Sequence, residues 1–299
     1  MNLLELLKRA KELKKPIFWD GAMGTQLIAR GLVGQAPELW NLEKPELIQE
    51  IHRAYVSAGA DVVQTNTFGA NPLKLKTEGL IEKLKEINQS AVRIAKGAVN
   101  GKALVAGDIG PTGEMMAPIG KLTPELAEEV YAEQAEALAK AGVDLFSIET
   151  MFDLEEVKSA IRGIKKVAPG IPIVAQMTFK KTAPGFFTMM GVSPEQGIEG
   201  MLEAGAEVVG ANCSIGPEKM VELVKVMRGI TTAWIIAQAN AGEPRLERGK
   251  ELYEFGAEEF SRYAVEMFRA GADCIGACCG SGPEFIKLMV EKFKRIDKK

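Results

Sequence analysis

Few side chains in this chain can act as nucleophiles or metal ligands. It contains one histidine and four cysteines among 299 residues. A Ser-His-Asp triad, a catalytic Cys-His pair or a cluster of imidazoles on a metal is therefore nearly excluded. The single histidine, His52, lies in the helical-looking segment IQEIHRAYV, where a packing role is the more frequent one. Any chemistry must then depend mainly on cysteines and carboxylates.

A weak repeat places several of these side chains in one register. The hexapeptides AGADVV, AGVDLF, AGAEVV and AGADCI begin at positions 58, 141, 204 and 270. Each is typical of a helix end that leads into a strand, because its glycine can adopt the left-handed conformation and its acidic residue starts the strand. The seventh and eighth positions after the four glycines are Asn66 and Thr67, Glu149 and Thr150, Asn212 and Cys213, and Cys278 and Cys279. In a closed barrel these residues lie at the carboxyl ends of strands and share one mouth.

Three thiols at one mouth, those of Cys213, Cys278 and Cys279, predict a zinc site with three protein ligands and an open fourth position. The fourth cysteine, Cys274, lies early in its strand and away from that rim. The alternative is that the three cysteines are small buried apolar residues, since adjacent cysteines lack the C-x-x-C spacing of common zinc motifs. A thiolate-rich zinc activates water poorly but deprotonates and holds a further thiol. The implied chemistry is S-alkylation of a thiol substrate.

A second polar group follows the first expected strand, in FWDGAMGTQL at 18–27. Asp20 ends that strand, and Gly21 and Gly24 leave backbone N–H groups open ahead of a helix, which suits a carboxylate. Such an aspartate, taken alone, is more often a helix cap. Beside Glu149, Asp20 could instead hold an ammonium group, and the pocket would then accept a thiol amino acid.

These residues need a scaffold of alternating strands and helices. Short apolar runs alternate with amphipathic stretches throughout, which predicts eight βα units. The expected strands are residues 17–20, 61–65, 103–107, 145–148, 171–177, 207–210, 234–238 and 273–276. Eight units describe a single (β/α)8 TIM barrel over residues 1–299, with its active site at the carboxyl ends of the strands. An open doubly wound sheet is the alternative, although a repeat on every second strand favours closure.

Charge and hydropathy exclude several kinds of partner. The 37 basic and 40 acidic residues give a net charge of −3 without a long block of either sign, so we expect no nucleic acid and no anionic membrane as partner. Charges interrupt residues 1–15, unlike a signal peptide, and no apolar run approaches the length of a membrane span. Four cysteines make a poor disulfide framework at this length, so we expect a cytoplasmic protein with reduced thiols.

Six segments along the chain resemble one family, the zinc-dependent homocysteine S-methyltransferases. They are DGAMGT (20–25), NTFGAN (66–71), GDIGPTG (107–113), IET (148–150), GANCS (210–214) and GACCGSGPEFI (276–286). They follow the family's order over nearly the whole chain. The first two look closest to the homocysteine module of cobalamin-dependent methionine synthase. The last segment departs from the family, which usually continues with a Thr-Pro-His type sequence where this chain has Ser281 and Glu284.

The resemblance implies a TIM barrel that transfers a methyl group to L-homocysteine and forms methionine. It implies that Cys213, Cys278 and Cys279 bind Zn²⁺ and act in catalysis, with the homocysteine thiolate in the open position. The implied substrate-binding residues are Asp20 and Glu149 at the amino group, the backbone near Gly21 and Ala22 at the carboxylate, Asn66 in NTFGAN, and Asn240. Asn240 matches a family position that can approach the zinc when substrate is absent.

The methyl donor is left open by the sequence. The cobalamin-type enzymes add folate, cobalamin and reactivation modules that nothing in these 299 residues supplies. We therefore expect methylcobalamin, held by a separate corrinoid protein or cobalamin module, as the donor. S-methylmethionine or another small methyl donor is the nearest alternative, and a non-catalytic thiol- or zinc-binding barrel is a second.

Two further features allow only weaker hypotheses. Lys180 and Lys181, just past the fifth strand, could form the Schiff base of an aldolase, although solvated loop lysines are far more common. Loop 181–193 contains Phe186, Phe187, Met189 and Met190 and could act as a lid, although packing is the more frequent role of such side chains.

Overall fold

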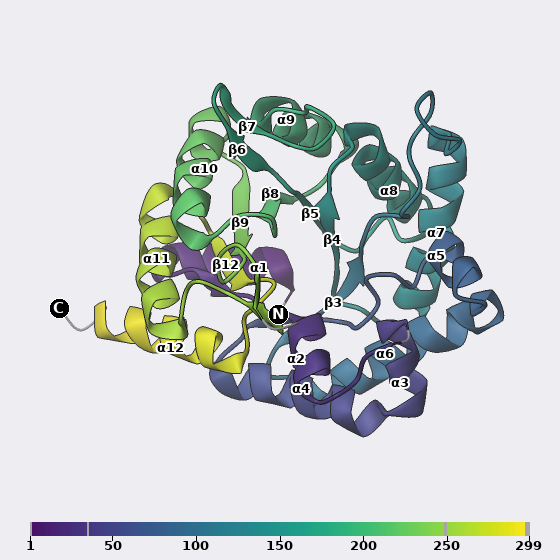
Figure 1. The fold of residues 1–299 in the computed structure, drawn as a ribbon, viewed down its shortest axis with the longest axis horizontal. Helices are drawn as coiled ribbons and strands as arrows, with labels where there is room; N and C mark the ends of the chain where they lie inside the picture. The colour runs from purple at the N-terminus through teal and green to yellow at the C-terminus, as the bar shows by residue number, and fades with distance from the viewer. Residues whose placement is uncertain (1, 35, 248–249, 297–299) are drawn as a thin grey trace.

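The computed structural model describes residues 2–34, 36–247 and 250–296. Eight parallel strands form its central sheet: β1 (Ile17–Phe18), β2 (Val62–Gln64), β3 (Leu104–Ile109), β4 (Leu145–Met151), β5 (Ile173–Met177), β8 (Val208–Asn212), β9 (Trp234–Ala239) and β12 (Cys274–Ala277). Their order is β1-β12-β9-β8-β5-β4-β3-β2 (Figure 1). Trp19, directly after β1, makes a parallel bridge to Val62, so the two end strands also meet. The sheet is therefore a closed (β/α)8 barrel, as predicted.

An outer ring of eight helices surrounds the strands (Figure 1). Its members are α4 (Pro45–Ala58), α6 (Leu84–Val99), α7 (Pro124–Ala141), α8 (Leu154–Val167), α9 (Pro194–Ala204), α10 (Pro217–Ile230), α11 (Ala257–Ala270) and α12 (Pro283–Ile296). Shorter helices lie in the loops that follow the first two strands: α2 (Met23–Ala29), η1 (Pro37–Leu39), α3 (Trp40–Glu43), α5 (Pro72–Thr77) and η2 (Ile81–Lys83). No helix in the described part of the chain is long and apolar enough to cross a membrane.

The repeat has the structural role that its spacing predicts. Gly59, Gly142, Gly205 and Gly271 end α4, α7, α9 and α11 in the left-handed conformation, with φ of 105°, 91°, 105° and 114°. The acidic residue of each repeat accepts a hydrogen bond from a backbone N–H of the neighbouring strand. The pairs are Asp61 with Phe18, Asp144 with Val105, Glu207 with Ile173, and Asp273 with Ile235. The four repeats thus join the barrel strands in pairs at their amino ends.

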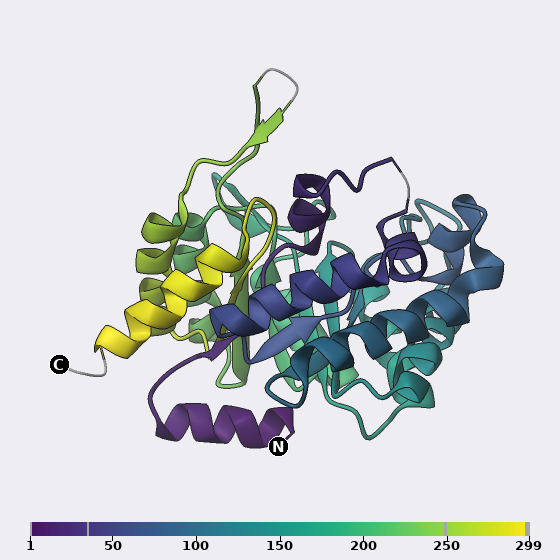
Figure 2. The same ribbon diagram turned by 90° about the horizontal axis from the view of Figure 1, so that it is seen from below.

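Helix α1 (Leu3–Glu12) seals the amino end of the barrel (Figure 2). A capping box between Asn2 and Glu5 starts this helix. Leu3 and Leu7 are fully buried against the lower barrel interior, in a cluster that includes Trp19 and Cys274. Cys274 therefore lies far from the carboxyl rim, as predicted, and burial raises the pKa of its thiol well above the ordinary value. With this end closed, ligands can enter only at the carboxyl end.

Two antiparallel hairpins extend the carboxyl end of the barrel. The first, β6 (Lys180–Thr182) and β7 (Gly185–Phe187), follows β5, and the second, β10 (Arg245–Glu247) and β11 (Lys250–Leu252), follows β9. In Figure 2 the second hairpin projects from the face opposite α1. Both hairpins lie in loops that follow the carboxyl ends of barrel strands, and none of their described residues lines the cavity described below.

Candidate active site

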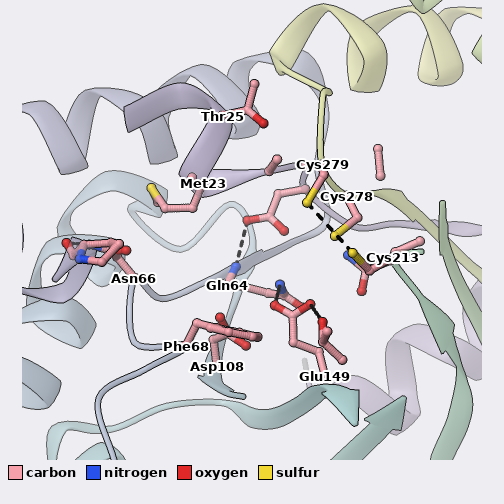
Figure 3. Close-up of a pocket in the computed structure, with 18 of the residues that line it drawn as sticks. Met23, Thr25, Gln64, Asn66, Phe68, Asp108, Glu149, Cys213, Cys278 and Cys279 are labelled. Atoms are coloured by element: carbon pink, nitrogen blue, oxygen red, sulfur yellow. Dashed lines mark hydrogen bonds between the residues drawn. The ribbon is translucent and has the colours of Figure 1, made fainter. Parts of the chain in front are cut away.

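A cavity of about 270 Å³ opens at the carboxyl end of the barrel. Its walls come from the loops after β1 and β2 and from the ends of β3, β4, β8, β9 and β12 (Figure 3). All the metal and substrate residues predicted from the sequence, except Asn240, line this cavity. Side chains separated by more than 250 positions, such as Asp20 and Cys278, thus line one cavity, because the carboxyl ends of parallel strands lie at the same rim of the barrel.

Three cysteines form one corner of the cavity. Cys213 follows β8, and Cys278 and Cys279 follow β12; their sulfur atoms all lie within 4.8 Å of one another. The Sγ atoms of Cys213 and Cys279 are 3.9 Å apart. The backbone N–H of Cys213 donates to the carbonyl of Gln238, and that of Cys278 donates to the carbonyl of Ala239. Strand β9 therefore holds both cysteine loops in place.

This sulfur arrangement fits a tetrahedral zinc ion. With Zn–S bonds of about 2.3 Å, tetrahedral sulfur ligands are separated by about 3.8 Å. Hydrogen bonds from the Cys278 and Cys279 thiols lower the pKa of Cys213 to about 3, which favours a thiolate at this position. The same contact with Cys213 raises the pKa of Cys279 to about 12. A divalent cation would remove this proton sharing, because metal ligation requires the thiolate form of each cysteine.

Three carboxyl groups line the same cavity as the sulfur atoms; those of Asp108 and Glu149 are labelled in Figure 3. Asp20, Asp108 and Glu149 are each at least nine-tenths buried. Burial raises the pKa of Asp20 and of Asp108 well above the ordinary value, and raises that of Glu149 to about 7. A hydrogen bond between the Asp108 and Glu149 carboxyl groups raises the pKa of Asp108 further and lowers that of Glu149. Among the residues that the structure describes, no lysine or arginine lines the cavity, so these carboxyl groups have no described cation there.

Glu149 is held by donors from three strands. Its Oε1 accepts from Gln64 Nε2 at 3.3 Å, and its Oε2 accepts from Asn212 Nδ2 at 2.5 Å and from the Thr150 hydroxyl at 3.3 Å. Strand β4 continues through Glu149 to Met151 with a register irregularity, and Thr150 adopts a positive φ of 60°. The sequence predicted an end at residue 148. The irregularity turns the Glu149 side chain into the barrel mouth.

The loop between β1 and α2 lies beside the second cysteine loop. Ser281 connects the two, because its hydroxyl donates to the Cys278 carbonyl at 2.7 Å and accepts from the Ala22 N–H at 3.2 Å. A Cβ on Gly21 would lie 2.7 Å from the Ser281 oxygen, so only glycine fits there. Helix α2 starts without a side-chain cap, which leaves its first N–H groups facing the cavity lined by Met23, Gly24 and Thr25. Ser281, a departure from the family pattern, thus joins the Gly21–Ala22 loop to the cysteine loop after β12.

The two predicted asparagines occupy different positions. Asn66 lines the cavity, but its Nδ2 donates to the carbonyl of Pro37 and to Asn41 Oδ1, which ties it to the wall. Asn240 lies after β9 and hydrogen bonds to Cys213, which lowers the pKa of that thiol further. Its Oδ1 is buried without a protein partner among the described residues. Asn240 is thus close to the sulfur cluster and Asn66 is remote from it.

Sequence reasoning gave no role to three residues that the structure places at the site: Gln64, Asp108 and Asn212. Asn212 occupies the same position of the repeat as Glu149, and Asp108 lies in the GDIGPTG segment. A role for both could therefore have been predicted from the sequence. No sequence pattern indicated Gln64, since its side chain reaches Glu149 only across the barrel from β2.

The residues that line the cavity support neither a Schiff-base lysine at 180 or 181 nor a lid formed by loop 181–193. Lys180 and Lys181 are exposed on β6, and Lys181 pairs with Glu222. Neither lysine lines the cavity. In loop 181–193, Phe186 is buried in the hydrophobic core and Met189 is 71% exposed. None of the four apolar side chains of that loop contributes to the cavity wall.

Comparison with known proteins agrees with this geometry. A sequence model of the family described as homocysteine S-methyltransferase matches residues 17–293. The chain is 30% identical over 290 residues to methionine synthase of Mycobacterium tuberculosis, covering 90% of this chain but only 24% of that protein. It is similar in structure to the oxidized form of the homocysteine methyltransferase MmuM from Escherichia coli, with a TM-score of 0.78, 26% identity, and coverage of 96% of this chain and 99% of that chain. The metallated form of MmuM gives a TM-score of 0.78 and 25% identity, over 95% of this chain and 99% of that chain.

Proposed function

This chain belongs to the homocysteine S-methyltransferase family, and we propose that it methylates the sulfur of L-homocysteine to form methionine. The observation that carries the proposal is the placement of three cysteine sulfurs and three carboxyl groups in the wall of one cavity. A thiol amino acid fits this arrangement, because its sulfur and its ammonium group need opposite surroundings. We propose residues 1–299 as one homocysteine-binding domain.

Cys213, Cys278 and Cys279 would hold a zinc ion, and homocysteine sulfur would take the fourth position. When bound, zinc would supply a deprotonated thiol at neutral pH, which is the nucleophile that S-methylation requires. The protein groups around the sulfurs keep the ligands in place: β9 carbonyls accept from the N–H groups of Cys213 and Cys278, and Asn240 hydrogen bonds to Cys213.

Asp20 and Glu149 would bind the ammonium group of the substrate. Both are buried in the cavity wall, where no described residue supplies a cation, so an ammonium group would stabilise their charged forms. The backbone near Gly21 and Ala22, at the uncapped start of α2, would face the substrate carboxylate. Because Ser281 already accepts from the Ala22 N–H, the neighbouring amides of this loop are the available donors. The substrate would thus be fixed at its sulfur, amino and carboxylate ends.

Methyl transfer from a bound donor is a direct displacement. The homocysteine sulfur forms the new S–CH₃ bond while the bond from the methyl carbon to the donor breaks, and its electron pair leaves with the donor. A cavity of about 270 Å³ holds an amino acid but not a corrinoid ring. The donor that we propose is methylcobalamin held by a corrinoid protein or module, because the chain is 30% identical to a methionine synthase over 290 residues.

A small donor such as S-methylmethionine is the second candidate. It is favoured by the structural match to MmuM, a homocysteine methyltransferase of which this chain covers 99%. Such a donor could act without any further module.

One assay separates these cases. Methionine formation from homocysteine is measured with free methylcobalamin, with a methylated corrinoid protein and with S-methylmethionine, each with and without a zinc chelator. We expect turnover with a corrinoid donor that the chelator abolishes. Turnover with S-methylmethionine alone would select the second candidate. Zinc and homocysteine binding without turnover on any donor would instead indicate a non-catalytic binding barrel.

A further inference from the structure

We propose that Asn212 is a positioning residue that joins the ammonium-binding carboxylate to the sulfur cluster. The inference rests on the proposed function, and it adds a residue to which neither the family resemblance nor the comparisons assign a role. Asn212 ends β8 and is fully buried, directly before Cys213. Its side chain does not line the cavity, so it acts only through other residues.

The orientation of the Asn212 amide is determined by its partners. Its Oδ1 accepts a hydrogen bond from the backbone N–H of Thr150 at 2.7 Å. A backbone N–H can only donate, so the amide oxygen must face Thr150 and the NH₂ group must face the other way. There Nδ2 donates to Glu149 Oε2 at 2.5 Å and to the Thr150 hydroxyl at 2.9 Å. Asn212 therefore fixes both the backbone and the carboxylate of the segment that bears Glu149.

The same side chain also reaches the sulfur cluster. Asn212 Nδ2 lies 3.9 Å from Cys278 Sγ. Asn212 itself precedes Cys213, whose backbone has a left-handed φ of 58° and is followed by Ser214 with a φ of 61°. Non-glycine residues adopt this conformation only where neighbouring contacts stabilise it. One buried amide thus lies between Glu149 and two of the three sulfur-bearing residues.

This arrangement sets the separation between the ammonium site and the thiol site. Glu149 is on β4 and Cys213 is on the loop after β8, two strands that are not adjacent in the barrel. Asn212 is the described side chain that hydrogen bonds to Glu149 and also contacts a sulfur atom of the cluster. Removing its donor should let Glu149 rotate away from the substrate, while the cysteines keep their own backbone anchors on β9. The expected loss therefore concerns the ammonium group and not the thiol.

The test compares two ligands in two variants. Asn212→Ala removes both functions of the amide, and Asn212→Leu removes its donor and acceptor while keeping most of its volume. Each variant is loaded with zinc, its zinc content is measured, and dissociation constants are determined for homocysteine and for 4-mercaptobutanoate, which lacks the amino group. We expect the dissociation constant of homocysteine to rise by about tenfold or more in both variants, as for loss of a hydrogen bond to a charged group. That of 4-mercaptobutanoate should change by less than about threefold, with one zinc per chain retained.

Asn88→Ala is the matched control. Asn88 is another fully buried amide, on α6, and it donates to the carbonyls of Ala70 and Leu84, away from the cavity. Its removal should destabilise the fold without changing the ratio of the two dissociation constants. Equal weakening of both ligands in the Asn212 variants, loss of zinc, or unchanged homocysteine binding would each overturn the proposal. A wild-type protein that binds no homocysteine would overturn the proposed function itself, which is a separate outcome.

Discussion

Cys274 and Cys278 differ in role because one lies at the start of β12 and the other directly after its end. Cys274 begins the strand in the sealed lower core, whereas Cys278 follows it at the open rim. Thiols at the rim can exchange protons with one another and with a metal, and a thiol in the apolar core cannot. The chemistry of each cysteine therefore depends on whether it lies at the amino or the carboxyl end of the barrel, and not on residue type alone.

Cys278→Ala and Cys274→Ala should separate these roles. We expect Cys278→Ala to lose stoichiometric zinc and all measurable methyl transfer, because two sulfur ligands hold zinc poorly. Cys274→Ala should keep both and lower the free energy of unfolding by about 1 kcal/mol, through a small cavity in the core. Metal analysis, the methyl-transfer assay and urea unfolding measure these effects. A zinc-free Cys278→Ala protein with normal turnover would refute the metal assignment.

His52 should make the fold sensitive to mild acid. The ring is fully buried on α4, with no hydrogen-bond partner for either nitrogen among the described residues, and burial lowers its pKa to about 4. Below about pH 6.5 the unfolded chain binds a proton that the folded chain does not bind until about pH 4. The stability contributed by neutral His52 is thus complete above pH 6.5 and is lost as the pH falls, by about 3 kcal/mol in total.

His52→Leu isolates this contribution. Buried carboxyl groups with raised pKa values act in the opposite direction, because the folded state then binds more protons as the pH falls. Subtracting the unfolding free energy of the variant from that of the wild type at each pH cancels their effect. The difference should fall steadily between pH 6.5 and 4. A constant difference would show that burial does not lower the pKa of His52 in the folded state.

At the scale of elements, replacing a repeat glycine with alanine should lower the free energy of unfolding by a different amount at each position. A Cβ at Gly142 meets nothing within 4 Å, so Gly142→Ala adds only the strain of a left-handed alanine, about 1 kcal/mol. A Cβ at Gly271 would lie 2.7 Å from Arg228 Cγ. Arg228 donates to the Gly271 carbonyl and to Asp273, the acidic residue of the same repeat, so Gly271→Ala should cost clearly more. Equal unfolding free energies for the two variants would contradict this difference.

At the scale of the whole molecule, the barrel separates stability at its amino end from binding at its carboxyl end. Helix α1 covers the amino mouth (Figure 2), where Leu3 and Leu7 are buried, and the candidate site lies at the carboxyl ends of the strands. This separation is typical of the fold, in which loops at the carboxyl face carry chemistry and the opposite face carries packing. Substitutions at the amino mouth should therefore change the free energy of unfolding without changing ligand binding at the carboxyl mouth.

Leu7→Ala tests that separation. Leu7 is 1% exposed, so its truncation should lower the free energy of unfolding by about 3 kcal/mol through lost burial and a cavity. Homocysteine binding should be unchanged while the protein stays folded. Leu4→Ala, on the same helix at 37% exposure, is the control and should cost well under half as much. A weaker homocysteine affinity in folded Leu7→Ala would mean that the two ends are coupled.

The order of the elements and most of the site were readable from the sequence, because both depend on local periodicity. The glycine of each repeat requires a left-handed helix end, and a fixed number of residues then leads to a strand end, so Glu149 and Cys213 could be placed at one rim. The predicted end of β4 was too early, because the irregularity around Thr150 depends on its contact with Asn212 on another strand.

Only the tertiary structure determined which side chains of the candidate site hydrogen bond to one another. The sequence determined that three cysteines and two acidic residues share a barrel mouth, since spacing along parallel strands is a one-dimensional property. It carried no signal that Gln64 reaches Glu149, that Ser281 joins the Ala22 loop to Cys278, or that Asp108 hydrogen bonds to Glu149. These contacts depend on barrel closure and on the rotamers of buried side chains, which arise only when distant segments pack together.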